Sequence, residues 1–440
     1  MIRSLLVANR GEIAVRIIRA CKELGIRTVA VYSEADRQAL HVKMADQAIC
    51  IGPPPSKDSY LNISNIISAA LHARADAIHP GVGFLSENAE FARQVQLAGL
   101  VWVGPDPQAI EMLGDKVSAK ANAKKYGVPC TPGLEGAVTN IEKTVEAVRD
   151  MGLPVIIKAS AGGGGKGMRV VRKVEDLADN IRIASSEAEK SFGDGTVFIE
   201  KYLENAAHVE LQMIGDKQGN VIYLGERDCS VQRNHQKLVE ESPSPLVTPE
   251  IRRRMGEDAV RLFKGIGYFG AGTIEFLFKD GQYYFMEVNS RIQVEHPVTE
   301  MITNVDLIKE MIRVANGEPL SVKQEDIRFD GYAMEIRINA TAPGTVKYYL
   351  PPSGFKVRVD SFLYTGYKVP PTYDSMVAKV IIGAPTRAEG INKMLSVLSE
   401  FELDGVPTNL ESQKKIINTS IFRKGGFGTN VLDAIMKEIG

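Results

Sequence analysis

The stretch Leu5-Leu6-Val7-Ala8-Asn9-Arg10-Gly11-Glu12-Ile13-Ala14 begins the first structural unit of this chain. Its apolar residues 5–8 predict a short buried strand, and Asn9-Arg10-Gly11 predicts a turn directly after it. Residues 12–24 carry apolar side chains at helical spacing, and residues 28–32 form the next apolar run. A strand, a helix and a second strand in this order predict a parallel sheet with crossover helices, so we expect an α/β fold.

The rest of the chain is predicted to form two further units. A smaller α/β unit begins at about residue 130, and a strand-rich region follows it to about residue 300. The last part mixes strands, expected at 332–339, 356–359 and 375–382, with helices expected at 388–401 and 410–418. Because 440 residues correspond to about three domains of roughly 150 residues, we expect domains at 1–112, 113–325 and 326–440.

The composition excludes two functional classes. Lys and Arg number 53, Asp and Glu number 54, and the net charge is −1, so a whole-chain basic field for nucleic acid is excluded. No apolar run approaches the roughly 20 residues that cross a bilayer, and the chain starts directly on a strand-like run, so we expect neither a membrane span nor a leader peptide. The four cysteines, Cys21, Cys50, Cys130 and Cys229, form no CxxC pair, which predicts buried free thiols in a reducing cytoplasm.

A glycine run at residues 158–168 reads Lys-Ala-Ser-Ala-Gly-Gly-Gly-Gly-Lys-Gly-Met. It matches GxGxxG, but residues 168–171 predict another strand where a dinucleotide site requires a helix. It is not a Walker A loop, since Lys166 precedes Gly167 instead of Ser or Thr. We favour a phosphate-binding loop between two strands, with a flexible linker as the alternative.

Two glutamates flank a predicted hairpin loop. Glu275 precedes Lys279-Asp280-Gly281, and Glu287 follows it. A two-residue loop would place the two side chains on opposite faces, whereas a three-residue loop with Gly281 in the left-handed region would place them on the same face. The sequence favours the second option, and two carboxylates on one face suit Mg²⁺. A pair of solvated acids on an exposed hairpin is the alternative.

The segment that continues from Glu287 alternates polar with apolar or small residues as far as Glu295. This period predicts an extended chain with a polar face, which His296-Pro297 then ends. An arginine on such a face can hold a small oxyanion while a nearby glutamate removes a proton. A surface strand facing water would show the same period.

Several motifs together resemble the biotin carboxylases, which belong to the carboxylating branch of the ATP-grasp enzymes. They are Asn9-Arg10-Gly11-Glu12-Ile13-Ala14, His79-Pro80-Gly81, Gly83-Phe84-Leu85-Ser86-Glu87-Asn88, Gly114-Asp115-Lys116, the loop 162–167, Glu226-Arg227-Asp228-Cys229-Ser230, Glu287-Val288-Asn289-Ser290-Arg291 and Gln293-Val294-Glu295-His296-Pro297. The resemblance covers nearly the whole chain. It implies a three-domain ATP-grasp architecture, α+β in the ATP-grasp part, with a mobile glycine-loop lid at about 130–203 and a C-terminal domain that completes the biotin side.

The resemblance also implies an activity. Such a ligase uses ATP, bicarbonate and the biotin of a carrier protein to form ADP, phosphate and N-carboxybiotin, with Mg²⁺ or Mn²⁺ as cofactor. Bicarbonate is phosphorylated to carboxyphosphate, which releases CO₂ for capture by the ureido nitrogen of biotin. The implied partners are a biotin carboxyl carrier protein, carboxyltransferase subunits and a second copy of the chain in a homodimer, to which the helix bearing Arg16, Arg19 and Glu23 is a candidate contributor.

The implied site residues fall into three groups. ATP would be bound by Lys116, Lys158, Gly164, Gly165, Glu200, Lys201, Leu203, His208, Gln232 and His235. Mg²⁺ would be held by Glu275 and Glu287, with Asn289 beside them. Bicarbonate would be surrounded by Lys237, Arg291, Gln293 and Val294, with Glu295 as the base that deprotonates it and Arg337 as the group that stabilises the biotin enolate. Ordinary core or surface histidines and a strand-face arginine are the alternatives for His208, His235 and Arg337.

Two departures from the family pattern concern the biotin side. Val82 stands where the family usually has Tyr, and the segment after Ala340 is shortened by several residues. Ala434-Ile435-Met436-Lys437 lies on a helix-like tail and does not suit a biotinylated hairpin, so the carrier is expected to be a separate protein. We expect the first half-reaction of an acetyl-CoA carboxylase. The alternatives are the same role in a pyruvate or other acyl-CoA carboxylase, and an ATP-binding scaffold that has lost carboxylation.

Overall fold

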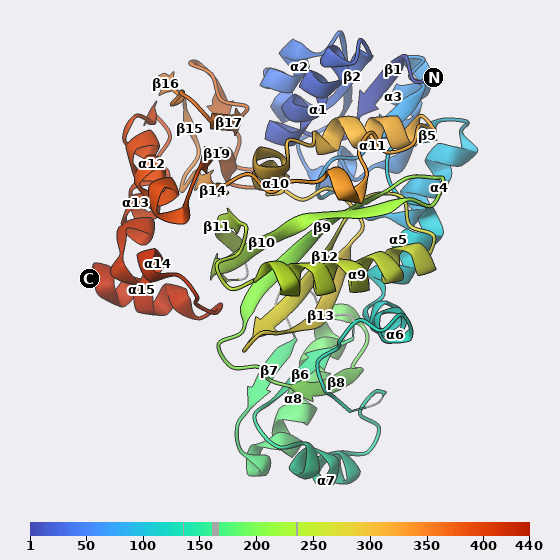
Figure 1. Ribbon diagram of the computed structural model, residues 1–440. Coiled ribbons are helices and arrows are strands. Elements are labelled where there is room, and N and C mark those ends of the chain that lie inside the picture. Colours follow the sequence, from blue (N-terminus) through green and yellow to red (C-terminus); the bar gives the residue numbers. More distant parts are fainter. Residues whose placement is uncertain (135, 161–166, 235) are drawn as a thin grey trace.

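The computed structural model describes residues 1–134, 136–160, 167–234 and 236–440 (Figure 1). Among these residues the strands form a five-stranded, a three-stranded and an eight-stranded sheet, and two ribbons of two strands each. Short 3-10 helices cover Glu34–Asp36, Ser56–Asp58, Val174–Asp176 and Gln324–Asp326. No helix of the described ranges is both long and apolar enough to cross a membrane.

The first unit contains a parallel sheet with the strand order β3-β2-β1-β4-β5, which confirms the α/β expectation. Its elements are β1 (Ser4–Val7), α1 (Gly11–Glu23), β2 (Arg27–Ser33), α2 (Leu40–Met44), β3 (Gln47–Gly52), α3 (Ile63–His72), β4 (Ala77–His79), α4 (Ala89–Leu97), β5 (Val101–Trp102) and α5 (Pro107–Gly114). Leu5 and Val7 of β1 pack into one core and Leu6 into another, so both faces of this strand are covered. That explains its continuous apolar run.

The cysteines are free, as expected, but only Cys21 and Cys229 are buried. Cys50 is exposed and Cys130 is partly exposed, so the expectation of burial is wrong for these two. Cys50 lies on β3, which is the edge strand of the first sheet, and this position leaves its side chain open to solvent.

A small antiparallel sheet, in the order β7-β6-β8, lies at the end of the molecule opposite the N-terminal sheet (Figure 1). The elements of this region are α6 (Lys116–Lys125), α7 (Ile141–Met151), β6 (Val155–Ala159), β7 (Met168–Val171), α8 (Leu177–Phe192) and β8 (Val197–Lys201). Lys158 pairs with Met168, so the glycine run connects two strands and not a strand and a helix. Residues 161–166 of that run lie outside the described residues.

The eight-stranded sheet has the order β13-β12-β9-β10-β11-β14-β19-β17. Its elements and the helices around it are β9 (Ala207–Gly215), β10 (Val221–Arg233), β11 (Gln236–Ser242), α9 (Pro249–Gly265), β12 (Gly270–Lys279), β13 (Gln282–Asn289), α10 (His296–Thr303), α11 (Leu307–Ala315), β14 (Tyr332–Asn339), β17 (Val357–Ser361) and β19 (Met376–Ala384). Because β11 pairs with β14, strands of the central and C-terminal segments share one surface. Helix α10 packs on four strands of it, β10, β11, β14 and β19.

The remaining C-terminal elements are β15 (Gly344–Thr345), β16 (Tyr348–Leu350), β18 (Lys368–Val369), α12 (Arg387–Ser399), β20 (Glu402–Asp404), α13 (Leu410–Asn418), α14 (Ser420–Lys424) and α15 (Val431–Ile439). They lie beside the end of the large sheet that carries β14 and β19 (Figure 1). In the shortened segment after Ala340, the backbone N–H of Thr341 donates to the carbonyl of Pro407 at 2.8 Å. The short connection is thus anchored directly to the chain that precedes α13.

The loop of the hairpin β12–β13 differs from our expectation. Lys279 pairs with Gln282, so the loop is the two residues Asp280-Gly281. Their φ values of 50° and 75° are those of a type I′ turn, whose twist matches the twist of the flanking strands. The expectation of a three-residue loop is therefore wrong.

The two glutamates nevertheless lie on the same face because the hairpin contains a bulge. Phe276 pairs with Phe285, but the next pair is Glu275 with Glu287, which leaves Met286 as an extra residue. A β-bulge of this kind shifts the register by one residue and turns the side chains beyond it to the other face. The extra residue Met286 thus reverses the effect of the two-residue loop on side-chain direction and brings the two carboxylates opposite each other.

The alternating segment after β13 is extended only at its start. Strand β13 ends at Asn289, residues 290–295 bend and turn, and α10 begins at His296 with Pro297 in its first turn. Proline is favoured there because its missing N–H has no helical partner at that position. The expectation of an extended chain as far as Glu295 is therefore wrong. The polar side chains of residues 291–295 lie in a bend that follows the strand.

Candidate active site

Polar side chains are buried together on the eight-stranded sheet, around Glu210. On β9 His208 and Glu210 are two residues apart and therefore share a face. Glu275 on β12 and Arg227 on β10 lie opposite Glu210 on either side. All four side chains are buried. Charged residues are rarely buried without a partner, so this cluster marks a candidate site.

Lys237 and Arg337 both contact Glu295, the residue that precedes α10. Nζ of Lys237 lies 2.5 Å from Oε1 of Glu295, and a guanidinium nitrogen of Arg337 lies 3.0 Å from Oε2. Burial opposes ionisation of this carboxyl, but the charges of Lys237 and Arg337 outweigh it and hold its pKa well below the usual range. Glu295 is therefore an anion between two cations at neutral pH.

A second carboxylate fixes Lys237 from the other side. Nζ of Lys237 lies 2.6 Å from Glu210, and Glu210 in turn accepts a hydrogen bond of 2.5 Å from Arg227. Arg227 is fully buried and also donates to Gln212 and Thr299, at 2.7 and 2.9 Å. Because every member has a partner, this network fixes Glu210 and so places Lys237 beside Glu295 while no anion is bound.

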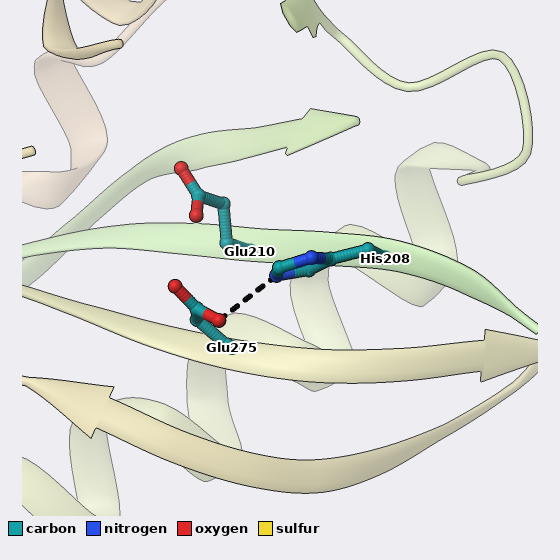
Figure 2. Close-up of side chains that lie close together, drawn as sticks. All are labelled: His208, Glu210 and Glu275. Carbon is teal, nitrogen blue, oxygen red and sulfur yellow. Dashed lines mark ion pairs between the residues drawn. The ribbon is translucent and has the colours of Figure 1, made fainter. Parts of the chain in front are cut away.

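Glu275 is held by four neighbours, one of which is Gln293, whose amide donates to it at 3.5 Å. Nε2 of His208 lies 2.9 Å from Glu275 (Figure 2), the amide of Asn289 donates to it at 2.8 Å, and Nζ of Lys237 lies 3.5 Å away. Burial opposes ionisation here too, but the charges of Lys237 and His208 lower the pKa of Glu275. Glu275 is therefore ionised.

Glu287, the residue opposite Glu275, has no positive charges nearby that outweigh the effect of burial on its pKa. Burial, and then the neighbouring charge of Glu275, raise the pKa of Glu287, while Lys116 lowers it. The buried Glu275 and the half-buried Glu287 side by side form a donor set of oxygen atoms with an excess of negative charge, which a divalent cation relieves. Glu275 and Glu287 therefore fit Mg²⁺ or Mn²⁺, and Asn289 lies next to them on β13.

Arg291 is positioned by groups from two distant parts of the chain. Its Nε donates to Glu87 at 2.8 Å, and its other nitrogens donate to Asn289 and Gln293, both at 3.0 Å. Val294 contributes its backbone, because its carbonyl accepts from the buried ammonium of Lys379. The bend 290–295 thus places a guanidinium, an amide and a carboxylate next to one another.

The lid strands carry the expected nucleotide-binding residues. Glu200 on β8 contacts Lys158 on β6 at 2.6 Å and Lys120 on α6 at 2.5 Å. Lys201 donates to the carbonyl of Leu153 at 3.0 Å, and Leu203 follows β8 and is half-buried. The structure therefore separates these residues from the cluster around Glu210 and places them on or beside the small sheet β7-β6-β8.

Two further residues expected near the nucleotide act on side chains of the large sheet. Gln232 on β10 lies 2.6 Å from Nδ1 of His208, and Lys116 begins α6 close enough to Glu287 to lower its pKa. Gly164, Gly165 and His235 lie outside the described residues.

Sequence reasoning missed several residues of the site. They are Glu87, Lys120, Glu210, Arg227, Glu240 and Lys379. Glu210 had a detectable signal, since it shares the face of His208 in a strand that is otherwise largely apolar. Lys379 and Glu240 carried no such signal, because their partners lie far away in the sequence.

Comparisons with known families cover most of the chain. The family model "Biotin carboxylase, N-terminal domain" matches residues 1–110, "Carbamoyl-phosphate synthase L chain, ATP binding domain" matches 115–323, and "Biotin carboxylase C-terminal domain" matches 335–434. Biotin carboxylase 1 of Bacillus subtilis is 55% identical over 443 residues, which cover 98% of each chain. A pyruvate carboxylase subunit from Methanothermobacter thermautotrophicus is 49% identical, over 100% of this chain and 91% of that one.

Solved structures agree with these relatives. The biotin carboxylase domain dimer of the Hydrogenobacter thermophilus 2-oxoglutarate carboxylase, in complex with MgADP, ADP and bicarbonate, superposes with a TM-score of 0.93 at 48% identity and covers 100% of this chain and 99% of that one. The biotin carboxylase of Campylobacter jejuni in a β-γ-ATP complex has a TM-score of 0.94 at 46% identity, over 99% of each chain. With the Lys237–Glu295–Arg337 cluster and these matches over the whole length, the chain belongs to the biotin carboxylase family of ATP-dependent ligases.

Proposed function

We propose that the chain carboxylates biotin on a separate carrier protein with bicarbonate and ATP, as the first half-reaction of an acetyl-CoA carboxylase. The observation that carries this proposal is the position of Glu295 between Lys237 and Arg337, at 2.5 and 3.0 Å. One buried carboxylate between two half-buried cations suits a reaction that brings a small oxyanion to a base and then builds negative charge on a second substrate.

Bicarbonate binds next to Glu295 in this proposal, with Arg291, Gln293, Lys237 and the Val294 backbone around it. Glu295 then takes its proton. In the free protein the charge of Lys237 is the largest of those that lower the pKa of Glu295. An anion that draws Lys237 away raises the basicity of Glu295 just when a base is required.

The deprotonated bicarbonate oxygen attacks the γ-phosphorus of ATP, and the bond to the bridging oxygen of ADP breaks. Carboxyphosphate then splits into CO₂ and phosphate, and the ureido nitrogen of biotin, whose proton passes to the phosphate, attacks the CO₂. Arg337 faces this step and stabilises the negative charge on the ureido oxygen. Its backbone is well supported, since its carbonyl accepts from Gln413 and Asn409 of the α13 region at 2.9 and 3.2 Å.

Glu275 and Glu287 hold Mg²⁺ or Mn²⁺ in this proposal, with Asn289 beside them. The bound metal neutralises charge on the ATP phosphates. Lys116 and Lys158 bind the phosphates, and Glu200, Lys201, Leu203, His208, Gln232 and His235 complete the nucleotide site, with Gly164 and Gly165 in the loop that covers it. Glu200 contacts Lys120 and Lys158, which ties the lid to α6 and supports its placement at the mouth of this site.

The domain division proposed is 1–112, 113–325 with the lid at about 130–203, and 326–440. The biotin carboxyl carrier protein and the carboxyltransferase would be separate partners. A homodimer is also proposed, in line with the dimeric Hydrogenobacter domain. In α1, Arg16 contacts Glu300 and Asp306 of its own chain and Glu23 contacts Lys309, which leaves the exposed Arg19 as the candidate for a contact between copies.

One assay tests the proposed reaction. ATP cleavage is measured with and without bicarbonate, then with free biotin, and then with purified biotinylated carrier. We expect bicarbonate-dependent cleavage that biotin and the carrier stimulate. Absence of bicarbonate dependence in every condition would contradict carboxylation and favour a scaffold that binds ATP.

A second candidate acceptor is supported by the relatives, since the Methanothermobacter protein that is 49% identical to this chain belongs to a pyruvate carboxylase. The acceptor site lies on another protein in either case. Reconstitution of the chain with carrier and with acetyl-CoA or pyruvate carboxyltransferase separates the two possibilities. The proposal requires carboxyl transfer to acetyl-CoA and is contradicted if only pyruvate is carboxylated.

A further inference from the structure

Beneath the start of α10 lie two carboxylates that the proposed reaction does not use. Glu240 on β11 and Glu335 on β14 are directly opposite each other in the antiparallel pair, and both are fully buried. Directly opposed side chains have Cβ atoms about 5 Å apart, so the two carboxyl groups lie within reach of each other. Like charges at that distance in a dry interior strongly oppose ionisation of both.

Hydrogen bonding in this pair is one-sided. Oε1 of Glu240 accepts from Nε of Arg337 at 2.6 Å and also contacts the other guanidinium nitrogen that reaches Glu295. Oε2 of Glu240 and both oxygens of Glu335 have no hydrogen-bond partner within the described part of the chain. Orphaned oxygen atoms in a fully buried pair require an explanation, and a single proton between the two carboxyls pairs two of these three atoms, one on Glu335 with Oε2 of Glu240.

The surrounding charges favour one ionised and one neutral acid. The charged groups that face Glu335 are Glu240 on β11, Arg337 on its own strand, Lys379 on β19 and Glu295 at the start of α10. Lys379 is already engaged by Glu12 at 3.3 Å and by the carbonyl of Val294. Burial, and then the charge of Glu240, outweigh Lys379 and raise the pKa of Glu335 well above its ordinary value.

We propose that Glu335 and Glu240 share one proton and so present a single negative charge to Arg337, which makes Glu335 a positioning residue for the carboxylation of biotin. This inference rests on the proposed function. Neutral Glu335 donates to the free oxygen of Glu240 and fixes the orientation of that carboxylate. Glu240 then holds Arg337, which can keep one nitrogen on Glu295 and turn its remaining donors toward the ureido oxygen.

The protonation of Glu335 is tested by the pH dependence of stability in E335Q. An acid whose pKa is raised on folding makes the protein lose stability as pH rises from the ordinary glutamate value, about 4.3, toward the raised value. Glutamine does not titrate, so the melting temperature of E335Q minus that of the wild type should increase steadily from pH 5.5 to pH 8. A difference that does not change with pH would show that Glu335 is ionised in the folded protein and would overturn the proposal.

The positioning role is tested by biotin kinetics in E335Q and E335L. The amide of E335Q still donates to Glu240, so kcat/KM for biotin should stay within about threefold of the wild type. Leucine cannot donate, and the resulting movement of Arg337 should lower kcat/KM for biotin by about tenfold or more, with the KM for ATP unchanged. Wild-type kinetics in both variants would overturn the positioning role.

Two controls keep the outcomes separate. If E335L does not fold, E335D replaces it, because the shorter side chain of aspartate cannot reach Glu240. A kcat/KM for biotin that falls in E335D supports the positioning role, and a wild-type value contradicts it. Bicarbonate-dependent ATP cleavage by the wild type is measured in the same experiment. Its absence would refute the proposed function itself, whereas the pH dependence of melting would still report on the proton between Glu240 and Glu335.

Discussion

Lys237 binds Glu295 at 2.5 Å and Glu210 at 2.6 Å, so one ammonium group connects the proposed base to the buried Arg227 network. The lowered pKa of Glu295 depends on this contact, since Lys237 is the first of the cations that outweigh its burial. Glu295 is thus ionised, correctly oriented and only weakly basic until the ammonium moves.

Replacement of Glu295 by Gln should abolish bicarbonate-dependent turnover and leave ATP binding largely intact. A general base contributes about 10²–10⁴-fold, and the amide keeps the size of the side chain. Steady-state ATP cleavage and nucleotide titration by calorimetry measure the two effects. Glu250→Gln, at an exposed position of α9, is the matched control. Loss of nucleotide binding in Glu295→Gln would mean that the residue belongs to the ATP site.

Glu287→Gln should weaken Mg²⁺ activation. The two opposed carboxylates together supply the charge that favours a divalent cation, and removal of one charge should raise the Mg²⁺ concentration for half-maximal activity by about tenfold or more. Titration of ATP cleavage with MgCl₂ at fixed free ATP measures this shift. An unchanged Mg²⁺ requirement would place the metal elsewhere.

Val82→Tyr should lower the KM for biotin. Val82 is half-buried, and its carbonyl accepts from Asn9 at 2.8 Å, which holds the glycine-flanked loop in place whatever the side chain. An aromatic ring there would add apolar contact on the side where biotin is proposed to bind. The rate of ATP cleavage at increasing concentrations of free biotin checks this expectation. An unchanged KM would mean that Val82 in place of Tyr has no effect on biotin binding.

Asp36→Asn should destabilise the protein strongly at neutral pH. Asp36 is fully buried and accepts from Arg10 at 2.6 and 2.9 Å and from Tyr60 at 2.6 Å. Loss of the carboxylate leaves Arg10 buried without its counter-ion, which costs about 3–5 kcal/mol. Thermal melting measures the effect, and Asp150→Asn, at an exposed position of α7, should change little.

The pH dependence of this effect has a definite sign. Burial opposes ionisation of Asp36, but Arg10 outweighs it and lowers its pKa, so the stabilisation is present above the ordinary aspartate value of about 3.9 and is lost as pH falls through the lowered one. The melting difference between Asp36→Asn and the wild type should therefore be constant from pH 6 to 8 and shrink below about pH 4. A difference that grows on acidification would contradict the ion pair.

The parallel sheet of the first unit and most helices and strands of the last unit could be predicted, because their patterns are local. The start of α10 could not, since Pro297 ends strands and begins helices equally well. The pairing of β11 with β14 could not be predicted either, because two strands about a hundred residues apart can pair without any pattern in their sequences that shows it. This pairing places Glu240 beside Glu335 and Arg337 near Glu295. Only the structure could therefore reveal this part of the site.

The bulge at Met286 has an evolutionary consequence. It lies between the two carboxylates and the turn, so the alignment of Glu275 with Glu287 is set inside the hairpin and does not depend on which residues form its tip. Exchanges at Asp280 and Gly281 among residues that suit the left-handed region, such as Asn and Gly, are therefore expected to leave this alignment unchanged as long as the tip keeps two residues. A single insertion or deletion between Phe276 and Met286 would instead exchange the faces of β13 and remove one carboxylate from its partner. The residues of this tip can therefore change within the small set that the left-handed region favours, whereas its length cannot change.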